Sequence, residues 1–417
     1  MALDDVHRAA ERVARESYGR LIALLAARTR DVAGAEDALS DAFAAALRTW
    51  PVDGVPDNPD AWLLTAARRR QTDVIRKQQV RSAGEEHVKR IANEIEAMAD
   101  QRDAIPDRRL ALMFACAHPA IDPGMRTPLI LQTVLGLTAE DIAAAFLVPP
   151  ATMGQRLVRG KTRIRDAGIP FRVPDAEELP ARLAAVLDAI YAAYTTSWND
   201  ASDGGISELA DEAVWLGELT VSLLPDQPEA KGLLALMLYT TARRAARRDV
   251  AGAYVPLEQQ DTKLWDRALI GLAEQLLHQA NAAGPSGRYQ IEAALQSAHV
   301  ARRLSGVANW AAVVALYDHL LAITGSPVVV LNRAVARAEL DGARAALADL
   351  APLAADKRMI AYQPYWAARG HLLSLAGDTA AAAHALTVSI SLTTDEAMKG
   401  YLMGRLDALQ DDRRTQT

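Results

Sequence analysis

The chain has 417 residues, of which 50% are hydrophobic and 24% are charged, and its formal net charge is -6. This length accommodates two or three domains with separate cores, and the composition excludes a disordered or fibrous protein. The single cysteine, Cys116, excludes an internal disulfide framework and fits a reducing cytoplasm. The N-terminus is polar and no apolar run is long enough to cross a bilayer, so the sequence predicts a cytoplasmic protein with no membrane contact.

The negative net charge hides two basic segments in the N-terminal part of the chain. Residues 62–82 hold six Arg or Lys side chains against one Asp, and residues 151–172 have the same balance. A division at Pro174 therefore leaves a slightly positive first part and an acidic remainder. Clustered cations of this kind indicate contacts with nucleic-acid phosphates.

Apolar residues recur at three- and four-residue spacing along almost the whole chain, which predicts an all-α protein. Breaks rich in Pro, Gly, Asn and Asp divide it into a helical domain (1–80), a charged linker (81–106), a small helical unit (107–170) and a helical extension (175–417). In the extension, Leu340–Ala343 repeats as Leu375–Asp378, at a spacing close to the tetratricopeptide period. The extension is therefore expected to be a tetratricopeptide-like helical repeat; a generic array of helical hairpins is the alternative.

Residues 31–50 form an amphipathic helix whose apolar stripe ends at Trp50. Asp37 and Asp41 lie on the opposite face, with Ser40 at its margin. This pattern is typical of a solvated acidic face or of a docking surface for a basic partner.

Residues 56–79 contain a Pro-rich loop, an aromatic residue and a basic helix, with Val74 expected on its buried side. Such a helix suits single-stranded DNA, because cations follow the phosphates while aromatic side chains take unstacked bases. The alternative is a solvated helix with internal ion pairs. The residues that carry either reading are Trp62, Arg69, Asp73, Arg76 and Lys77.

Residues 137–165 have the pattern of a helix-turn-helix. Thr138 and Asp141 are spaced as a capping box at the start of the first helix, and Phe146 is expected to face inward. The second helix presents long polar side chains opposite its apolar stripe, where they can read base edges in the major groove. These side chains are Gln155, Arg156, Arg159 and Arg163; the alternative is an ordinary cationic surface helix.

No catalytic pattern accompanies these segments. Gly154–Thr162 resembles a phosphate-binding loop, but five residues separate its glycines and it lies within a helical period. The histidines show no zinc-binding spacing, and Cys116 beside His118 fits a buried thiol and a capping imidazole better than a nucleophile pair. The sequence thus predicts a protein that is not an enzyme and needs neither metal nor cofactor.

Several of these segments together resemble the extracytoplasmic-function sigma factors of bacterial RNA polymerase, in the branch with a C-terminal tetratricopeptide-like extension. AEDALSDAF (35–43) is similar to the core-binding helix of that family, and NPDAWLLTAARRRQTDVIRK (58–77) to its promoter-melting helix. The most specific likeness is FLVPPATMGQRLVRGKTRIRDAGIPFRVP (146–174), in the fourth sigma region. SPVVVLNRAVA (326–336) and EQQDTKLWD (258–266) resemble the extension.

The resemblance implies roles for particular residues. Asp37, Ser40 and Asp41 would dock on the clamp helices of the largest polymerase subunit, and the fourth region would meet the polymerase flap. The -10 element would be bound by Trp62, Arg68, Arg69, Asp73, Arg76 and Lys77. The -35 element would be bound by Gln155, Arg156, Val158, Arg159 and Arg163.

The expected function is therefore that of a sigma factor, which binds core polymerase, recognises promoter DNA and helps to open it, under the control of its own extension. The extension would leave a surface for a protein or small ligand. Two alternatives remain open: a helix-turn-helix regulator that works without polymerase, and a tetratricopeptide-like scaffold protein.

Overall fold

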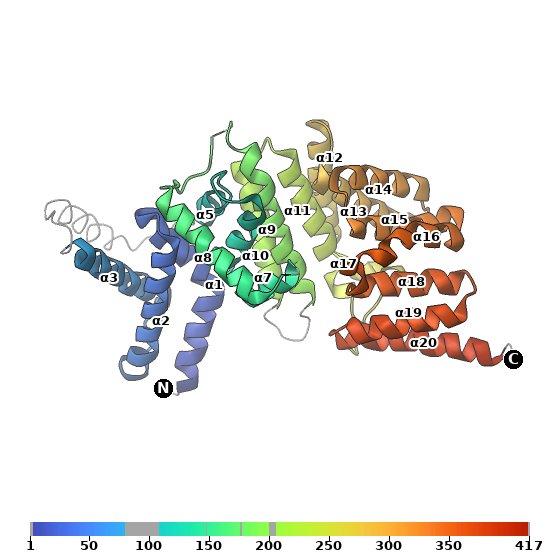
Figure 1. Ribbon diagram of the computed structural model, residues 1–417, viewed down its shortest axis with the longest axis horizontal. Coiled ribbons are helices and arrows are strands. Elements are labelled where there is room, and N and C mark those ends of the chain that lie inside the picture. The colour runs from blue at the N-terminus through green and yellow to red at the C-terminus, as the bar shows by residue number, and fades with distance from the viewer. Residues whose placement is uncertain (1–2, 80–107, 147, 176, 200–205, 416–417) are drawn as a thin grey trace. The chain divides into compact units, whose positions relative to one another are not determined.

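The computed structural model describes residues 3–79, 108–146, 148–175, 177–199 and 206–415, and these residues form helices and their connections (Figure 1). Within the described residues, the β-structure is one bridge between Arg248 and Tyr254. The prediction of an all-helical protein is confirmed. The predicted linker, 81–106, lies outside the described residues. The chain divides into two compact units, Met1–Thr196 and Ser197–Thr417.

The first unit begins with three long helices that contact one another pairwise. Their buried side chains include Leu21, Leu39 and Leu63, and Trp50 closes the end of this core with 1% of its surface exposed. Val74, expected on the buried side, is exposed, because it lies in the last part of the third helix. These helices are α1 (Leu3–Thr29), α2 (Val32–Asp53) and α3 (Pro59–Gln79).

Further helices, α5 to α9, follow in the described part of the first unit. Local capping explains where several begin: Asp31 accepts a hydrogen bond from the Gly34 amide at the start of α2, and Asp122 accepts one from Gly124. Proline occupies the first turn of three of the helices, where its missing N–H costs nothing. The helices are α5 (Arg109–Cys116), α6 (Pro123–Thr133), α7 (Ala139–Ala145), α8 (Pro150–Asp166) and α9 (Pro180–Asn199).

Within this unit α1 packs on α5, and α2 packs on α8. A Cβ atom added to Gly19 in the middle of α1 would lie 1.7 Å from the carbonyl oxygen of Val134, so this approach requires glycine. Lys161 of α8 and Glu36 of α2 form an ion pair of 2.5 Å whose side chains are 10% and 17% exposed. Both contacts join segments that are far apart in the sequence.

Helix α9 belongs to the first unit. The Arg126 guanidinium donates to the carbonyl oxygen of Ala181, while Leu183 and Leu187 of α9 are buried. The compact units consequently divide at Thr196, whereas the sequence analysis began the extension at residue 175.

The second unit is a succession of helices, most of which contact the next helix along the chain. Its described helices enclose apolar clusters, including one around Leu320 and Val313 and one around Leu350 and Tyr365. Its α-helices are α10 (Ile206–Leu223), α11 (Pro228–Thr241), α12 (Arg267–Ala282), α13 (Arg288–Ser305), α14 (Trp310–Thr324), α15 (Pro327–Asp341), α16 (Ala343–Leu350), α17 (Lys357–Ile360), α18 (Gln363–Leu375), α19 (Thr379–Leu392) and α20 (Glu396–Thr415).

The two copies of the sequence repeat occupy equivalent turns in this unit. Gly342 lies between α15 and α16 with φ of 83°, and Gly377 lies between α18 and α19 with φ of 84°. Backbone with positive φ favours glycine, so the repeated glycine has a local cause in both turns. Buried small or apolar residues follow each turn, at Ala346 and Ala382.

Candidate nucleic-acid interface

The acidic face of α2 is exposed. Asp37, Ser40 and Asp41 all reach solvent, opposite the buried Leu39. Asp41 also pairs with Arg70 of α3 at 2.5 Å, with about half of each side chain exposed (52% and 49%). An ion pair in this setting contributes little, about 0.2–1 kcal/mol, so Asp41 can exchange this partner for another cation at small cost.

The basic helix α3 separates its predicted DNA-binding residues into two groups. Arg69, Asp73 and Arg76 are exposed along one side. Arg68 is half-buried, and burial together with the neighbouring cation of Arg28 lowers its pKa. The Lys77 side chain lies outside the described residues. The exposed part of this predicted surface is therefore the side that carries Arg69.

Trp62 lies at the start of α3 and packs edge-on against Trp50, with ring centroids 5.5 Å apart and an interplanar angle of 67°. Its indole is partly buried, so only part of the ring is available to a base. Asp60 anchors the same end of α3: its Oδ2 accepts hydrogen bonds from Arg20 at 2.6 Å and from Ser17 at 3.0 Å. The sequence analysis did not select Asp60, because its partners are about forty positions away in α1.

The helix pair α7 and α8 begins as the sequence predicts. The amide of Asp141 donates to the Thr138 hydroxyl, and the Thr138 amide donates back to the Asp141 carboxylate, at 3.2 Å in each case. The capping box is thus confirmed. Phe146 is 38% exposed, so the expectation that it faces inward is wrong; it stands at the end of the short helix α7, beyond the buried Ile142 and Ala143.

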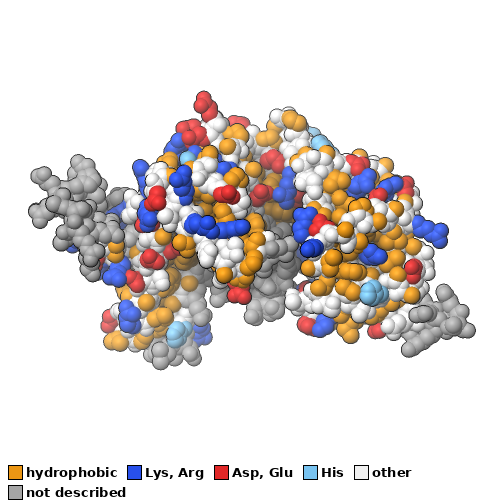
Figure 2. Space-filling model, viewed as in Figure 1, with side chains coloured by type: hydrophobic (Ala, Val, Ile, Leu, Met, Phe, Trp, Pro, Cys, Tyr) orange, Lys and Arg blue, Asp and Glu red, His pale blue; other side chains and the backbone are white. Residues whose placement is uncertain are grey.

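Helix α8 presents a polar face to solvent, and cationic side chains gather over it in Figure 2. Gln155, Arg156, Arg159 and Arg163, which the sequence analysis placed on this face, are all exposed. Val158, which the resemblance added, is exposed as well. Arg159 donates from Nε to the Gln155 carbonyl oxygen at 3.4 Å, and Arg163 donates to that of Ala120 at 3.3 Å. Since both bonds use only Nε of each guanidinium, the terminal nitrogens can meet base edges or phosphates.

The opposite side of α8 contains a residue that sequence reasoning missed. Lys161 is 8% exposed, in line with the buried Leu157 and Ile164, and its ammonium meets Glu36. Burial raises the pKa of Glu36, with Asp37 adding to the rise, while Lys161 opposes both. The signal available in the sequence was its place on the apolar stripe of α8.

Cys116 and His118 have structural environments. The Cys116 thiol lies 3.4 Å from the Thr133 hydroxyl, and burial raises its pKa to about 12, so the thiol remains protonated at neutral pH. The His118 Nδ1 accepts a hydrogen bond from the Ala120 amide at 3.1 Å, as a capping imidazole does. The segment Gly154–Thr162 lies inside α8, where its amides belong to the helix.

Among the described residues no group of three or more His, Cys, Asp and Glu side chains is arranged to hold a metal ion. None of the described helices combines the length and apolarity that a bilayer span requires.

Two family profiles match the chain. Residues 13–81 match sigma-70 region 2, and residues 182–281 match a family of unknown function, DUF6596. The helices α1 to α3 are thus a sigma-70 region 2, the part of a sigma factor that binds core RNA polymerase and the -10 promoter element, which indicates a transcription factor rather than an enzyme.

The chain is also 37% identical over 381 residues to an uncharacterized protein of Rhizobium meliloti (strain 1021), covering 90% of each sequence. It belongs to the same family as that bacterial protein. No solved structure matches it.

Proposed function

We propose that this protein is a sigma factor of the extracytoplasmic-function type, which recognises both a -10 and a -35 promoter element and is controlled by its own C-terminal unit. The observation that carries the proposal is the combination within one compact unit of a sigma-70 region 2 and the capped helix pair α7–α8, with its exposed Gln and Arg face. A polymerase-independent regulator has no need of the first element, and a scaffold protein has no need of either.

Core polymerase would dock on the acidic face of α2. Asp37 and Asp41 are exposed on a helix whose other side is buried, so a basic clamp can approach them without disturbing the core. Ser40 stands between them and supplies a hydroxyl. The weak pair between Asp41 and Arg70 would open on docking, which would also release a cation toward nearby DNA.

The -10 element would lie along the exposed side of α3. Arg69 and Arg76 supply cations for the phosphates of a separated strand, with Asp73 between them as a hydrogen-bond acceptor. Arg68 and Trp62, both partly buried, would line the inner edge of this surface. Lys77 would extend it.

The -35 element would be read by α8 in the major groove. Gln155 and Arg159 are one helical turn apart on the exposed face, and these are the side-chain types that bind adenine and guanine edges. Arg156 and Val158 flank them, and Val158, 62% exposed, offers an apolar contact of the kind that thymine methyl groups accept. Arg163, farther along the helix, would contact phosphate.

The C-terminal unit would be a tetratricopeptide-like repeat that promoter-dependent transcription requires. Its two equivalent glycine turns and its neighbour-to-neighbour helix contacts support the repeat. The apolar clusters of its described helices favour a stable body over a loose acidic mask. Because α9 packs with the first unit, the informative truncation follows Thr196; a chain ending near Val173 would also remove buried residues of α9.

Run-off transcription with purified core polymerase tests the proposal. The full chain should direct initiation from a subset of promoters, and replacing Asp37 and Asp41 with Arg should abolish both transcription and co-purification with core enzyme, because like charges at a contact cost several kcal/mol. Asp226→Arg with Asp407→Arg makes the same charge change at exposed positions in the second unit and should have no effect. Sequence-specific DNA binding without polymerase-dependent transcripts would favour the regulator instead.

The chain truncated after Thr196 separates the roles of the C-terminal unit. If that unit is a required contact, the truncated chain should remain folded and bind DNA but give no transcripts. Activity above that of the full chain would mean that the unit masks the promoter-binding helices.

A further inference from the structure

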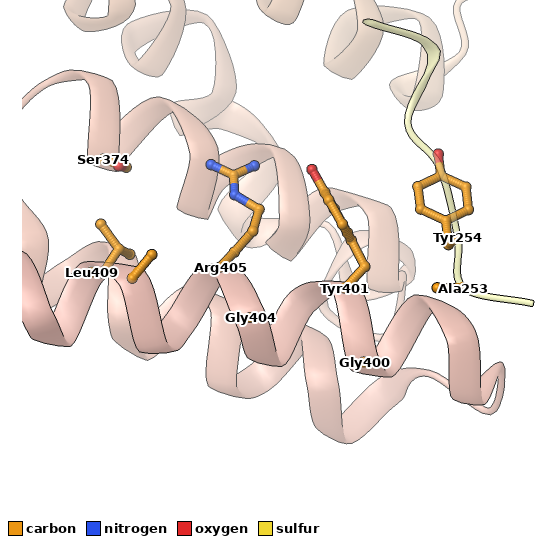
Figure 3. Close-up of a pocket in the computed structure, with 9 residues that line it drawn as sticks. Ala253, Tyr254, Ser374, Gly400, Tyr401, Gly404, Arg405 and Leu409 are labelled. Carbon is orange, nitrogen blue, oxygen red and sulfur yellow. The ribbon is translucent and has the colours of Figure 1, made fainter. Parts of the chain in front are cut away.

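A pocket of about 530 Å³ opens in the second unit, between α20, the end of α18 and the loop that carries Tyr254 (Figure 3). This size lies within the range of small-molecule sites. Its lining contains one charged side chain, Arg405, and no carboxylate. Two tyrosines and one serine supply hydroxyl groups, and the remaining lining residues are small or apolar.

Arg405 has no counter-charge among the described residues. Its guanidinium lies 3.1 Å from His371 Nδ1, and it forms no ion pair with a described carboxylate. Because a guanidinium can only donate, the imidazole accepts at Nδ1 and is neutral there; burial and the Arg405 charge both lower the pKa of His371. A half-buried cation with a neutral partner is suited to receive an anion.

The aromatic groups at the pocket are held in place by the fold. Tyr254 and Tyr401 pack edge to face with ring centroids 5.4 Å apart. Arg248 fixes the loop, since it donates to the Gly252 carbonyl oxygen and pairs at 3.1 Å with Asp395, which also caps α20. Figure 3 shows the Arg405 guanidinium and the hydroxyl groups of both tyrosines directed to the same side of α20.

The floor of the pocket is unusually open for a helix surface. Gly400 and Gly404 lie one turn apart inside α20, and a Cβ atom added to either would meet nothing within 4 Å. Glycine is a poor helix former, and here no packing inside the fold explains it. The same glycines do, however, keep the space beside Arg405 and Tyr401 free.

We propose that this pocket binds a carboxylate carried on an apolar body, with the carboxylate on Arg405 and the tyrosine hydroxyls and the body over Gly400 and Gly404. A planar carboxylate matches the paired donors of a guanidinium, and the ring of Tyr401 offers an apolar wall. The occupant is either a free organic acid or the C-terminal carboxylate of a peptide. This inference is independent of the proposed sigma-factor activity, since it concerns binding by the second unit alone.

Binding can be measured on the full chain without polymerase or DNA, so its failure and that of the sigma-factor proposal are distinguishable. The probes are acetate, hexanoate, 3-phenylpropionate and glutarate at about 10 mM, each beside its uncharged amide, together with the tripeptide Ala-Ala-Phe in free-acid and amidated forms. At least one acid should raise the unfolding temperature by about 2 °C or more, and its amide should not. If a small organic acid binds and the tripeptide does not, the occupant is a free metabolite. If the free-acid tripeptide binds more tightly than the small acids, the occupant is the C-terminus of a peptide.

Two variants test the geometry. Arg405→Gln should weaken binding about tenfold or more, while Arg344→Gln, an exposed arginine outside the pocket, should not. Gly404→Leu fills the pocket and should abolish binding although it favours the helix, so loss of folding cannot explain the result. Gly271→Leu makes the same change at an open, exposed position of α12 and should retain binding. If no acid in the panel binds, or if binding survives both Arg405→Gln and Gly404→Leu, the proposal is overturned.

Discussion

Replacing Gly19 with Ala tests the closest approach in the first unit. The added Cβ would lie 1.7 Å from the Val134 carbonyl oxygen and 2.7 Å from its carbonyl carbon. Ordinary contact between such atoms needs 3.4 Å or more, so α1 and the end of α6 would have to separate by about 1.7 Å. Because the atoms that the added Cβ meets are backbone atoms of Val134, no flexible side chain can move aside to relieve the clash.

Two opposing free-energy terms set the effect of this substitution on stability. Alanine in a helix interior gains about 1 kcal/mol over glycine, whereas overpacking of this kind costs about 1–3 kcal/mol and sometimes more. The free energy of unfolding should therefore fall by up to about 2 kcal/mol, and by more where the strain exceeds the usual overpacking cost. Gly154→Ala in α8, where an added Cβ meets nothing, provides the control and should raise stability by about 1 kcal/mol.

Urea-induced unfolding of the full chain, followed by tryptophan fluorescence, measures both variants, because Trp50 is buried in the first unit and Trp62 packs against it. Gly19→Ala should unfold at lower urea than the parent chain, and Gly154→Ala at higher urea. An equal increase in the urea concentration at the unfolding midpoint of both variants would refute the close packing of α1 on the 108–170 helices.

Three further predictions concern other parts of the chain. Burial lowers the pKa of His299 to about 4, so below pH 6.5 the unfolded chain binds a proton at this side chain while the folded chain does not. The free energy of unfolding should therefore fall by roughly 1–3 kcal/mol between pH 6.5 and 4. In unfolding measured across that pH range, His299→Gln should reduce this dependence of stability on pH, and His319→Gln should not. Lys161→Met leaves Glu36 buried without its partner and should lower the free energy of unfolding by about 3 kcal/mol. The double variant with Glu36→Leu should recover most of this loss. A double variant less stable than Lys161→Met alone would contradict the ion pair. If α8 reads the -35 element, Arg159→Ala should weaken DNA binding by about 1–3 kcal/mol and relax the preference at one or two bases of a promoter library. Arg163→Ala should weaken binding to all sequences alike. Unchanged base preferences in Arg159→Ala would exclude α8 as the helix that reads the bases.

The sequence predicted features that have local causes. The capping box of Thr138 and Asp141 depends on residues three positions apart, and helical periodicity alone places Gln155 and Arg159 on the exposed side of α8. The repeated glycine turns, at Gly342 and Gly377, were visible for the same reason, since a positive φ is a requirement of one residue.

Features with distant causes were missed or misplaced. Lys161 was not recognised as a buried residue because its partner, Glu36, belongs to another segment. Val74 and Phe146 have apolar side chains at suitable spacing, yet each lies near the end of its helix and is exposed. The sequence analysis began the extension at the proline-rich break near residue 175, and the DUF6596 match begins at residue 182, whereas α9 packs back onto α6 and the compact units divide at Thr196.

The ion pair of Glu36 and Lys161 joins positions 125 residues apart, and this separation has a consequence for synthesis. At about 5–20 residues per second, α2 leaves the ribosome roughly ten seconds before the residue that neutralises its buried carboxylate. For most of that interval the side of α1 that receives Val134 also lacks its partner. The N-terminal helices of the nascent chain therefore expose apolar surface while translation continues, and a chaperone that protects them would act before the chain reaches α9.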